Sequence, residues 1–368
     1  MRFLAISLGF NAPGPDRVGS KERLDQIVAA ADRAEQAGLD GFGVGEHHTP
    51  DTEVSAPPVL LAAIAARTSR IRLFTAVTVL SVLDPVRVAE DYATLDNLSG
   101  GRVEMIIGKG NTEVQARVFG YSLDDQWERN AEKYDLLRRL IHEPSVTWSG
   151  RFRPPLVDFV PRPDWLQSPP RIWHGSATST NSTELAARYG DPLYSANVTG
   201  RREQYAELVD HYRERLAAYG HPPERALVGA GAAAVHVAPT SQQARAEFAP
   251  VFAARLARAS TFRQTVPFAD LDDAIANGSY LVGSPEEVLD QLGQLHGLLG
   301  HEVQHIGTAD EPDPVLQRGI DAFLGDVLPQ AREAFPDRLW EPVTSPPDAE
   351  PPANDHPILA PTVEAGRP

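Results

Sequence analysis

An acid and two adjacent histidines follow a short apolar run of the sequence. Glu46, His47 and His48 lie in the stretch GVGEHHTP, directly after residues 39–45. An imidazole at the rim of a pocket can accept or donate a proton near neutral pH. A metal site would need a third ligand at a suitable spacing, which the sequence does not offer, so we expect no bound metal. The alternative is a turn in which one histidine is structural and the other is solvated.

Two other stretches have residue types that bind a phosphate. Lys109 stands between two glycines at the end of an apolar run, and it is one of three lysines in a chain of net charge −16. The stretch GSATSTNST at residues 175–183 brings glycine and hydroxyls to the start of a predicted helix, where backbone N–H groups and the helix dipole favour an anion. Taken separately, the stretch around Lys109 is also explained as an ordinary glycine turn, and residues 175–183 as an ordinary helix cap. Together, on neighbouring strands, they favour a phosphate site.

These residues need a scaffold that brings several strand ends together. Short apolar runs alternate with amphipathic helical segments, which gives about eight strand–helix units and predicts an α/β fold, a TIM (β/α)8 barrel. We expect insertions after strands 4 and 7, the first with a helix at residues 127–142 and a hairpin turning at Ser149 and Gly150. The predicted strands are residues 2–10, 39–45, 70–80, 102–108, 171–175, 192–197, 226–238 and 302–307.

Capping residues mark the predicted helices between these strands. Asp84 and Pro85 open one helix and two glycines close it at residues 100–101, as expected for helix ends. In a barrel of this kind the chemistry lies at the carboxyl ends of the strands. We therefore expect Phe10, Ser195 and Asn197, which lie at the ends of strands one and six, to line a substrate pocket together with His48.

Composition limits the class of protein. The chain has 368 residues, 42% of them hydrophobic, and no cysteine, which excludes disulfides, thiolate metal sites and cysteine nucleophiles. A net charge of −16 disfavours nucleic acid and anionic membranes as partners. No apolar run reaches the roughly 18–20 residues of a membrane span, and the N-terminal run is too short for a signal peptide, so we expect a cytoplasmic protein. We predict one barrel domain at residues 1–338 and an extended or disordered proline-rich tail at 339–368.

Three segments resemble the bacterial luciferase-like, flavin-dependent monooxygenases. GFGVGEHHTP is similar to the family's motif after strand two, and the stretch LFTAVTVLSVLDPVRVAEDYATLDNLSGGRVEMIIGKG is similar to its core from strand three to strand four. GSATSTNSTELAARYGDPL is similar to its phosphate region after strand five. The resemblance covers roughly residues 1–335. It implies a TIM barrel that binds FMN at the carboxyl ends of its strands.

The resemblance also implies roles for individual residues. Ala76 and Val77 match the segment beneath the flavin ring, where the family often has a non-proline cis peptide. His47 matches the catalytic histidine, and we expect Glu46 to orient it or to contact substrate. Gly108 stands where luciferase itself has a cysteine, which argues against light emission. The residues that match the family's flavin-phosphate contacts are Gly108, Lys109, Gly110, Gly175, Ser176, Ser179, Thr180 and Ser182.

The implied function is a two-component monooxygenase. Reduced FMN, supplied by a separate flavin reductase, and molecular oxygen would oxidise a small organic substrate in a protein that forms a homodimer. One alternative is a barrel of the same kind that transfers hydride to or from FMN or a deazaflavin, and another is a non-catalytic flavin-binding homologue. An unrelated barrel hydrolase is disfavoured because the sequence has no clear nucleophile elbow or carboxylate pair.

Overall fold

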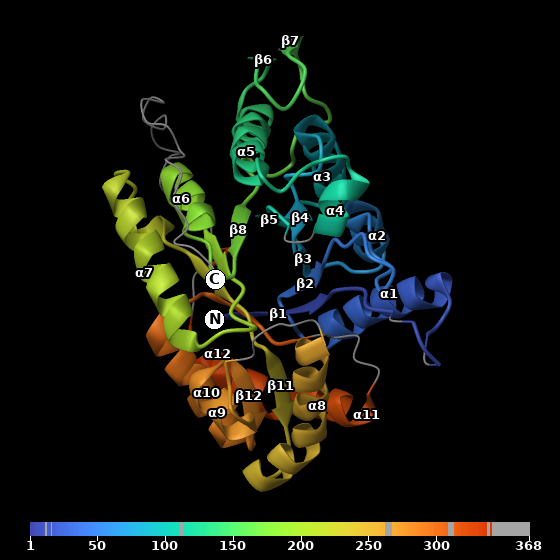
Figure 1. Cartoon of the computed structure of the whole chain (residues 1–368), viewed down its shortest axis with the longest axis vertical. Coiled ribbons are helices and arrows are strands. Elements are labelled where there is room, and N and C mark those ends of the chain that lie inside the picture. Colours follow the sequence, from blue (N-terminus) through green and yellow to red (C-terminus); the bar gives the residue numbers. More distant parts are fainter. Residues whose placement is uncertain are drawn as a thin grey trace.

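Eight parallel strands form a closed barrel in the computed structural model (Figure 1). The structure describes residues 1–11, 13–15, 17–110, 113–261, 267–307, 313–336 and 339–340. Each strand pairs with the next, and the pairings of β1 with β13 and of β3 with β5 close the ring. The predicted TIM barrel is therefore confirmed. The barrel strands are β1 Arg2–Ser7, β2 Gly41–Val44, β3 Arg72–Thr75, β5 Val103–Gly108, β8 Ile172–Ser176, β9 Leu193–Ser195, β10 Val228–Ala230 and β13 Val303–His305.

Helices cover the outside of the barrel, and their ends follow the predicted capping residues (Figure 1). The Asp84 side chain accepts hydrogen bonds from the backbone N–H groups of Val86 and Arg87, and Gly100 ends the same helix in the left-handed conformation at φ 71°. The last helical segment, residues 314–334, is interrupted by a π-helical turn, η2 Phe323–Val327. The surrounding helices are α1 Ser20–Gln36, α2 Pro57–Ala65, α3 Pro85–Ser99, α6 Thr180–Tyr189, α7 Arg202–Ala218, α10 Pro285–Leu299, α11 Pro314–Ala322 and α12 Leu328–Ala334.

The two predicted insertions lie at opposite ends of the long axis in Figure 1. The first, after β5, holds α4 Glu113–Val118, α5 Gln126–His142 and the antiparallel pair β6 Val146–Trp148 and β7 Leu156–Phe159. The second, after β10, holds β11 Ala234–Val237, α8 Ser241–Thr261, α9 Leu271–Asn277 and β12 Tyr280–Gly283. Strand β11 does not continue the barrel strand β10, because it pairs with β12 in a separate two-stranded sheet.

Three sequence predictions need correction. The strand predicted at 226–238 divides into β10 and β11, because the N–H of Gly231 bonds to Ser195 and Asn197 where the chain leaves the barrel. The strand predicted at 70–80 divides into β3 and β4 Thr78–Val79, and the Ala76–Val77 peptide bond between them is cis, as the family resemblance implied. The predicted tight turn at residues 149–150 is a loop over residues 149–155, because its backbone N–H groups bond to the Glu132 carboxylate of α5.

Large side chains fill the lower and middle levels of the barrel interior. Phe74 and Trp173 are fully buried there, and Tyr194 packs beside Trp173 with ring centroids 6.1 Å apart. Inward-facing glycines make room for them: a Cβ on Gly41 would lie 2.7 Å from the Phe74 ring, and one on Gly229 would lie 2.4 Å from the Tyr194 ring. Large side chains, accommodated by glycines on the neighbouring strands, therefore fill the barrel interior at these levels.

Leu339 and Trp340, which the sequence assigned to the tail, pack against the amino-terminal end of the barrel. The Trp340 indole N–H donates to the buried carboxylate of Glu104, and the guanidinium groups of Arg2 and Arg72 lie 5.3 and 5.2 Å from its ring. Packing on the barrel thus continues to residue 340. The domain boundary at residue 338 stays a prediction, and residues 341–368 lie outside the described residues.

Candidate active site

The inner wall of the barrel is open to solvent at the carboxyl ends of the strands. Inward-facing residues there are partly exposed and mostly small, whereas their outward-facing neighbours in the sequence are mostly buried. Because the deeper side chains of Leu4, Phe74 and Trp173 are fully buried, solvent reaches this wall from the carboxyl end. We call this region the cup. Its partly exposed wall residues are Leu8, Ala76, Val77, Gly108, Gly175, Ala196, His305 and Gly307.

Backbone pairing of two loops places the histidine motif at the rim of the cup. The loop after β1 and the loop after β2 are joined by hydrogen bonds from Asn11 N–H to Asp51 and from Glu53 N–H to the carbonyl of Gly9. Gly9 has φ 66°, and a Cβ on it would lie 2.5 Å from Val54, so this approach requires glycine. The N–H of His47 completes the contact by donating to the carbonyl of Val54 at 2.9 Å.

His47 lies on the inward side of the motif. Its Cε1 atom is 3.3 Å from the point that a Cβ on Gly45 would occupy, and its ring centroid is 6.1 Å from that of Phe10. Burial lowers the pKa of His47, although the carboxylates of Asp51 and Glu46 oppose this. The buried Nδ1 atom has no hydrogen-bond partner among the described residues. A neutral imidazole with a free nitrogen at this position can take a proton from a ligand in the cup.

Glu46 pairs with His48, so the expectation that it orients His47 is wrong. Glu46 Oε1 lies 3.0 Å from His48 Nε2, and Glu46 Oε2 accepts the backbone N–H of Val79 at 2.9 Å. The carboxylate is buried, and the hydrogen bonds help to offset its desolvation. Alternation along the chain explains the pairing, because residues 46 and 48 share one side and residue 47 faces the other. The Phe119 ring covers the other side of His48, edge-on at 4.8 Å.

Lys109 follows β5 and points outward, toward the start of α5. Its Nζ atom lies 3.2 Å from the Gly110 carbonyl and 3.3 Å from Gln126 Oε1, and 5.1 Å from the centre of the Trp127 ring. Burial lowers the pKa of Lys109. The register of β5 against β8 pairs Ile107 with His174, so two residues further along Lys109 stands beside Ser176. The structure therefore brings both predicted phosphate clusters to one place.

The amino end of α6 contributes hydroxyls there, but not all of those predicted. Ser179 caps the helix by accepting the N–H of Asn181, which leaves its own hydroxyl hydrogen available, and Thr180 is exposed. Ser176 is unsuitable as a phosphate donor, because its hydroxyl is buried and already donates to the Ser179 carbonyl. Ser182 is also buried. Gly108 and Gly175 belong to the inner wall, where a Cβ on either would meet the Val77 side chain at 2.7 and 3.0 Å.

Ser195 and Asn197 do not face the cup, which corrects their predicted role in binding substrate. Ser195 follows the inward-facing Tyr194 on β9, so it points to the helical layer, and it is fully buried. Asn197 is fully buried too, and its Oδ1 accepts the N–H of Gly231, which ties the ends of β9 and β10 together. Phe10, in contrast, is 43% exposed at the rim.

Sequence reasoning placed His305 at the end of the last strand without giving it a role, and it missed Gln126 and Phe119. The alternation along β13 could have placed His305 on the inner wall, since it follows Val303 by two residues. Gln126 and Phe119 come from the first insertion, and nothing local in the sequence predicts their contacts with Lys109 and His48. Within the described residues, no group of three or more His, Asp or Glu side chains is arranged to hold a metal ion. Of the helices described, none combines the length and apolarity that crossing a membrane requires.

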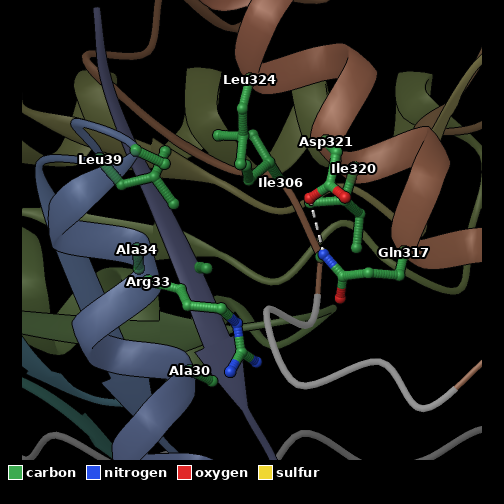
Figure 2. A pocket seen from close by; sticks show the side chains of 12 residues that line it. Ala30, Arg33, Ala34, Leu39, Ile306, Gln317, Ile320, Asp321 and Leu324 are labelled. Carbon is green, nitrogen blue, oxygen red and sulfur yellow. Dashed lines mark hydrogen bonds between the residues drawn. The ribbon is translucent and has the colours of Figure 1, made fainter. Parts of the chain in front are cut away.

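A cavity of about 80 Å³ lies outside the barrel, between α1 and the helical segment α11–η2 (Figure 2). Its wall is mostly apolar, and Gln317 and Asp321 are joined at one side by a hydrogen bond of 2.9 Å. Of the cup residues, only Gly307 also touches this cavity, so it is distinct from the candidate active site. Its apolar lining includes Ala30, Ala34, Leu39, Ile306, Ile320 and Leu324.

Comparison with known proteins places this site in a family. Residues 1–302 match the luciferase-like monooxygenase family. The chain is 28% identical to the 4-hydroxyprotoasukamycin monooxygenase of Streptomyces nodosus subsp. asukaensis over 73% of this chain and 76% of that protein. It is 26% identical to the oxygenase component of the flavin-dependent trigonelline monooxygenase of Acinetobacter baylyi, over 54% of this chain and 55% of that protein. The structure of the monooxygenase RslO1 from Streptomyces bottropensis superposes with a TM-score of 0.77 at 27% identity, covering 90% of this chain and 99% of that one. The chain belongs to the luciferase-like monooxygenase family.

Proposed function

We propose that this protein is a flavin-dependent monooxygenase that uses reduced FMN and molecular oxygen to oxidise a small organic substrate. The observation that carries the proposal is the cup: a solvent-accessible inner wall of small residues, with two histidines at its rim, in a luciferase-like chain. A wall of this kind leaves space for a planar ring along Ala76 and Val77. Relatives named as monooxygenases support the reaction type.

The residues present fit the phosphate end of FMN. Lys109 supplies a cation after β5, and the first turn of α6 supplies N–H groups and the hydroxyls of Ser179 and Thr180 after the adjacent β8. A local cation is required because the net charge of −16 repels anions from the protein as a whole. Gly110 has φ 74°, and a Cβ on it would lie 2.8 Å from Val79, so glycine is needed for the turn that follows Lys109.

When bound, reduced FMN supplies the electrons that activate oxygen; the protein positions the reactants and moves protons. In the proposal, the His47 imidazole takes or returns a proton at the rim, and the Glu46 carboxylate holds His48 beside it. Phe10 and Phe119 flank the two histidines and limit the access of water. The substrate is a small molecule that enters over this rim.

The proposal includes a partner, a separate flavin reductase that delivers reduced FMN. It is supported by the trigonelline relative, which is named as the oxygenase component of its enzyme. The test is an anaerobic titration with reduced and oxidised FMN, followed by recording of oxygen uptake with an added reductase. Saturable binding of reduced FMN with oxygen uptake is expected. Binding without oxygen uptake, but with hydride transfer from an added alcohol to oxidised flavin or from reduced flavin to an added ketone, would instead assign the hydride-transfer alternative.

A further inference from the structure

His305 lies on the inner wall of the cup, in a position that the site described above leaves without a role. Its strand, β13, pairs with β1 so that His305 is opposite Leu4, an inward-facing core residue. Side chains opposite each other on neighbouring strands share a face, so His305 also points into the barrel. The residue is partly exposed, whereas Gln304 and Ile306 on either side are buried. Since the levels below are filled, this exposure is toward the cup.

One hydrogen bond determines which nitrogen of His305 carries the proton. Nε2 lies 2.9 Å from the carbonyl oxygen of Gly307, which can only accept, so Nε2 is the N–H donor. Gly307 adopts φ 105°, and its carbonyl also accepts the N–H of Ile6, so the acceptor is held in place from two sides. Burial lowers the pKa of His305 to about 4, and the ring is neutral at neutral pH. Its Nδ1 atom therefore carries a lone pair, and Nδ1 has no partner within the described residues.

We infer that His305 is a ligand-binding residue that accepts, through Nδ1, a hydrogen bond from an O–H or N–H group of the molecule held in the cup. A neutral acceptor on this wall favours an uncharged donor over an anion. The donor is either an N–H of the flavin ring or a hydroxyl of the substrate, and the chemistry of recognition is the same in both cases. The inference rests on the proposed function only in taking the cup to hold these molecules.

The test uses two substitutions and two pairs of probes on the full chain. His305→Leu removes the acceptor with little change in volume, and His305→Asn restores an oxygen close to the position of Nδ1. The first pair of probes is FMN and its N3-methyl analogue, which lacks the ring N–H, with dissociation constants measured by fluorescence. The second pair is phenol and anisole, compared by saturation-transfer NMR. Tyr194→Phe is the control, because it removes a buried hydroxyl of another inward-facing barrel residue that has no partner among the described residues.

A single neutral hydrogen bond corresponds to about a three- to tenfold preference for the donor-bearing probe. If the flavin is the donor, the wild type prefers FMN to the methylated analogue by this factor, His305→Leu abolishes the preference, and His305→Asn recovers part of it. If the substrate is the donor, the same pattern holds for phenol against anisole while FMN binding is unchanged. Equal preferences in the wild type and His305→Leu for both pairs would overturn the inference. A wild type that binds no flavin would overturn the proposed function, and the phenol pair would still decide the role of His305.

Discussion

The Nε2 atom of His48 lies 3.0 Å from Oε1 of Glu46, and the other oxygen of this buried carboxylate accepts the N–H of Val79. Glu46 thus connects the histidine motif with β4, the segment that follows the inner-wall residues Ala76 and Val77. A buried carboxylate with two fixed partners holds His48 in one orientation. His47, in contrast, keeps a buried nitrogen without a partner in the described part of the chain. Protein contacts therefore hold His48 in place, whereas the His47 side chain is available to a ligand.

The first prediction separates these roles. We expect His47→Ala to keep FMN binding nearly unchanged and to lower substrate oxidation by about a hundredfold or more, because a positioned acid or base contributes roughly 100- to 10,000-fold. Oxygen uptake should continue and yield hydrogen peroxide in place of product. We expect His48→Ala and Glu46→Gln to have similar effects on turnover, since each disrupts the contact between Glu46 and His48. Both should act by changing the position of the loop that carries the histidines.

The measurements are oxygen uptake, peroxide and product in parallel for the three variants. A His47→Ala protein with normal product formation beside an inactive His48→Ala protein would reverse the assignment. If none of the three substitutions alters turnover, the motif is a solvated turn and the proton donor must be sought elsewhere on the rim.

The second prediction concerns the flavin phosphate. Lys109→Ala should weaken the binding of FMN by about tenfold or more and the binding of riboflavin much less, because only FMN carries the phosphate. A hydrogen bond to a charged group contributes about 1.5–3 kcal/mol, which corresponds to a loss of this size. The binding constants of both flavins are measured by fluorescence quenching. Lys21→Ala is the matched control, since Lys21 is exposed on α1 and pairs with Asp25. Equal losses for both flavins would remove Lys109 from the phosphate site.

The barrel and the position of its functional end could be predicted from the sequence. Alternation of apolar runs with capped helices depends on local residue types, so it predicts the eight units, and both insertions follow from breaks in that alternation. The breaks inside two predicted strands could not be found in this way. At Gly231 the chain leaves the barrel because its N–H bonds to residues of another strand, and such a contact has no local signal.

The same limit applies to the site. Adjacent residues on a strand face opposite sides, and the order of the motif was enough to expect His47 and His48 to diverge. That rule also predicts that Glu46 shares a side with His48, yet the partner that fixes it, Val79, is 33 residues away in sequence. Ser195 was misplaced because residues at a strand end were treated alike, regardless of the face on which alternation puts them.

The third prediction concerns pH and stability. Burial lowers the pKa of five histidines: His47, His142, His296, His301 and His305. The unfolded chain therefore binds more protons than the native protein below about pH 6.5, and the free energy of unfolding falls as the pH falls through this range. For His301, whose pKa is lowered to about 3, the contribution is about 1.4 kcal/mol per pH unit until the folded pKa is reached.

Urea unfolding between pH 5.0 and 6.5 measures this slope, in a range where most carboxylates are already ionised. His301→Asn should unfold with a shallower pH dependence than the wild type, whatever its absolute stability. Identical slopes in the two proteins would show that the His301 imidazole is protonated in the native state.

The fourth prediction is a homodimer. Val59 on α2 is 72% exposed and Leu98 on α3 is 67% exposed, and these helices pack against each other on one side of the barrel. Sedimentation velocity at micromolar concentration should give about twice the monomer mass of 40.0 kDa. Replacing both residues, Val59→Glu with Leu98→Glu, should give monomers, because a buried interface does not tolerate unpaired charges. A wild-type protein that sediments at 40.0 kDa would contradict the prediction.

The fifth prediction is that Trp340 seals the amino-terminal end of the barrel. Glu104 is fully buried there, and it accepts hydrogen bonds from the indole N–H groups of Trp173 and Trp340. Trp340→Phe keeps a ring between the two arginines but removes one of the two donors to Glu104 Oε1, which retains Arg171 at 3.0 Å, and we expect a loss of about 1–3 kcal/mol in the free energy of unfolding. Trp340→Ala also removes the ring, so the loss in the free energy of unfolding should be larger, about 3 kcal/mol or more.

Trp165→Phe is the control, because no hydrogen bond of the Trp165 indole occurs among the described residues. This substitution should change the free energy of unfolding by less than about 1 kcal/mol. Equal stability of Trp340→Phe and the wild type would mean that Arg171 or water satisfies Glu104 without the indole, and that Trp340 does not seal this end of the barrel.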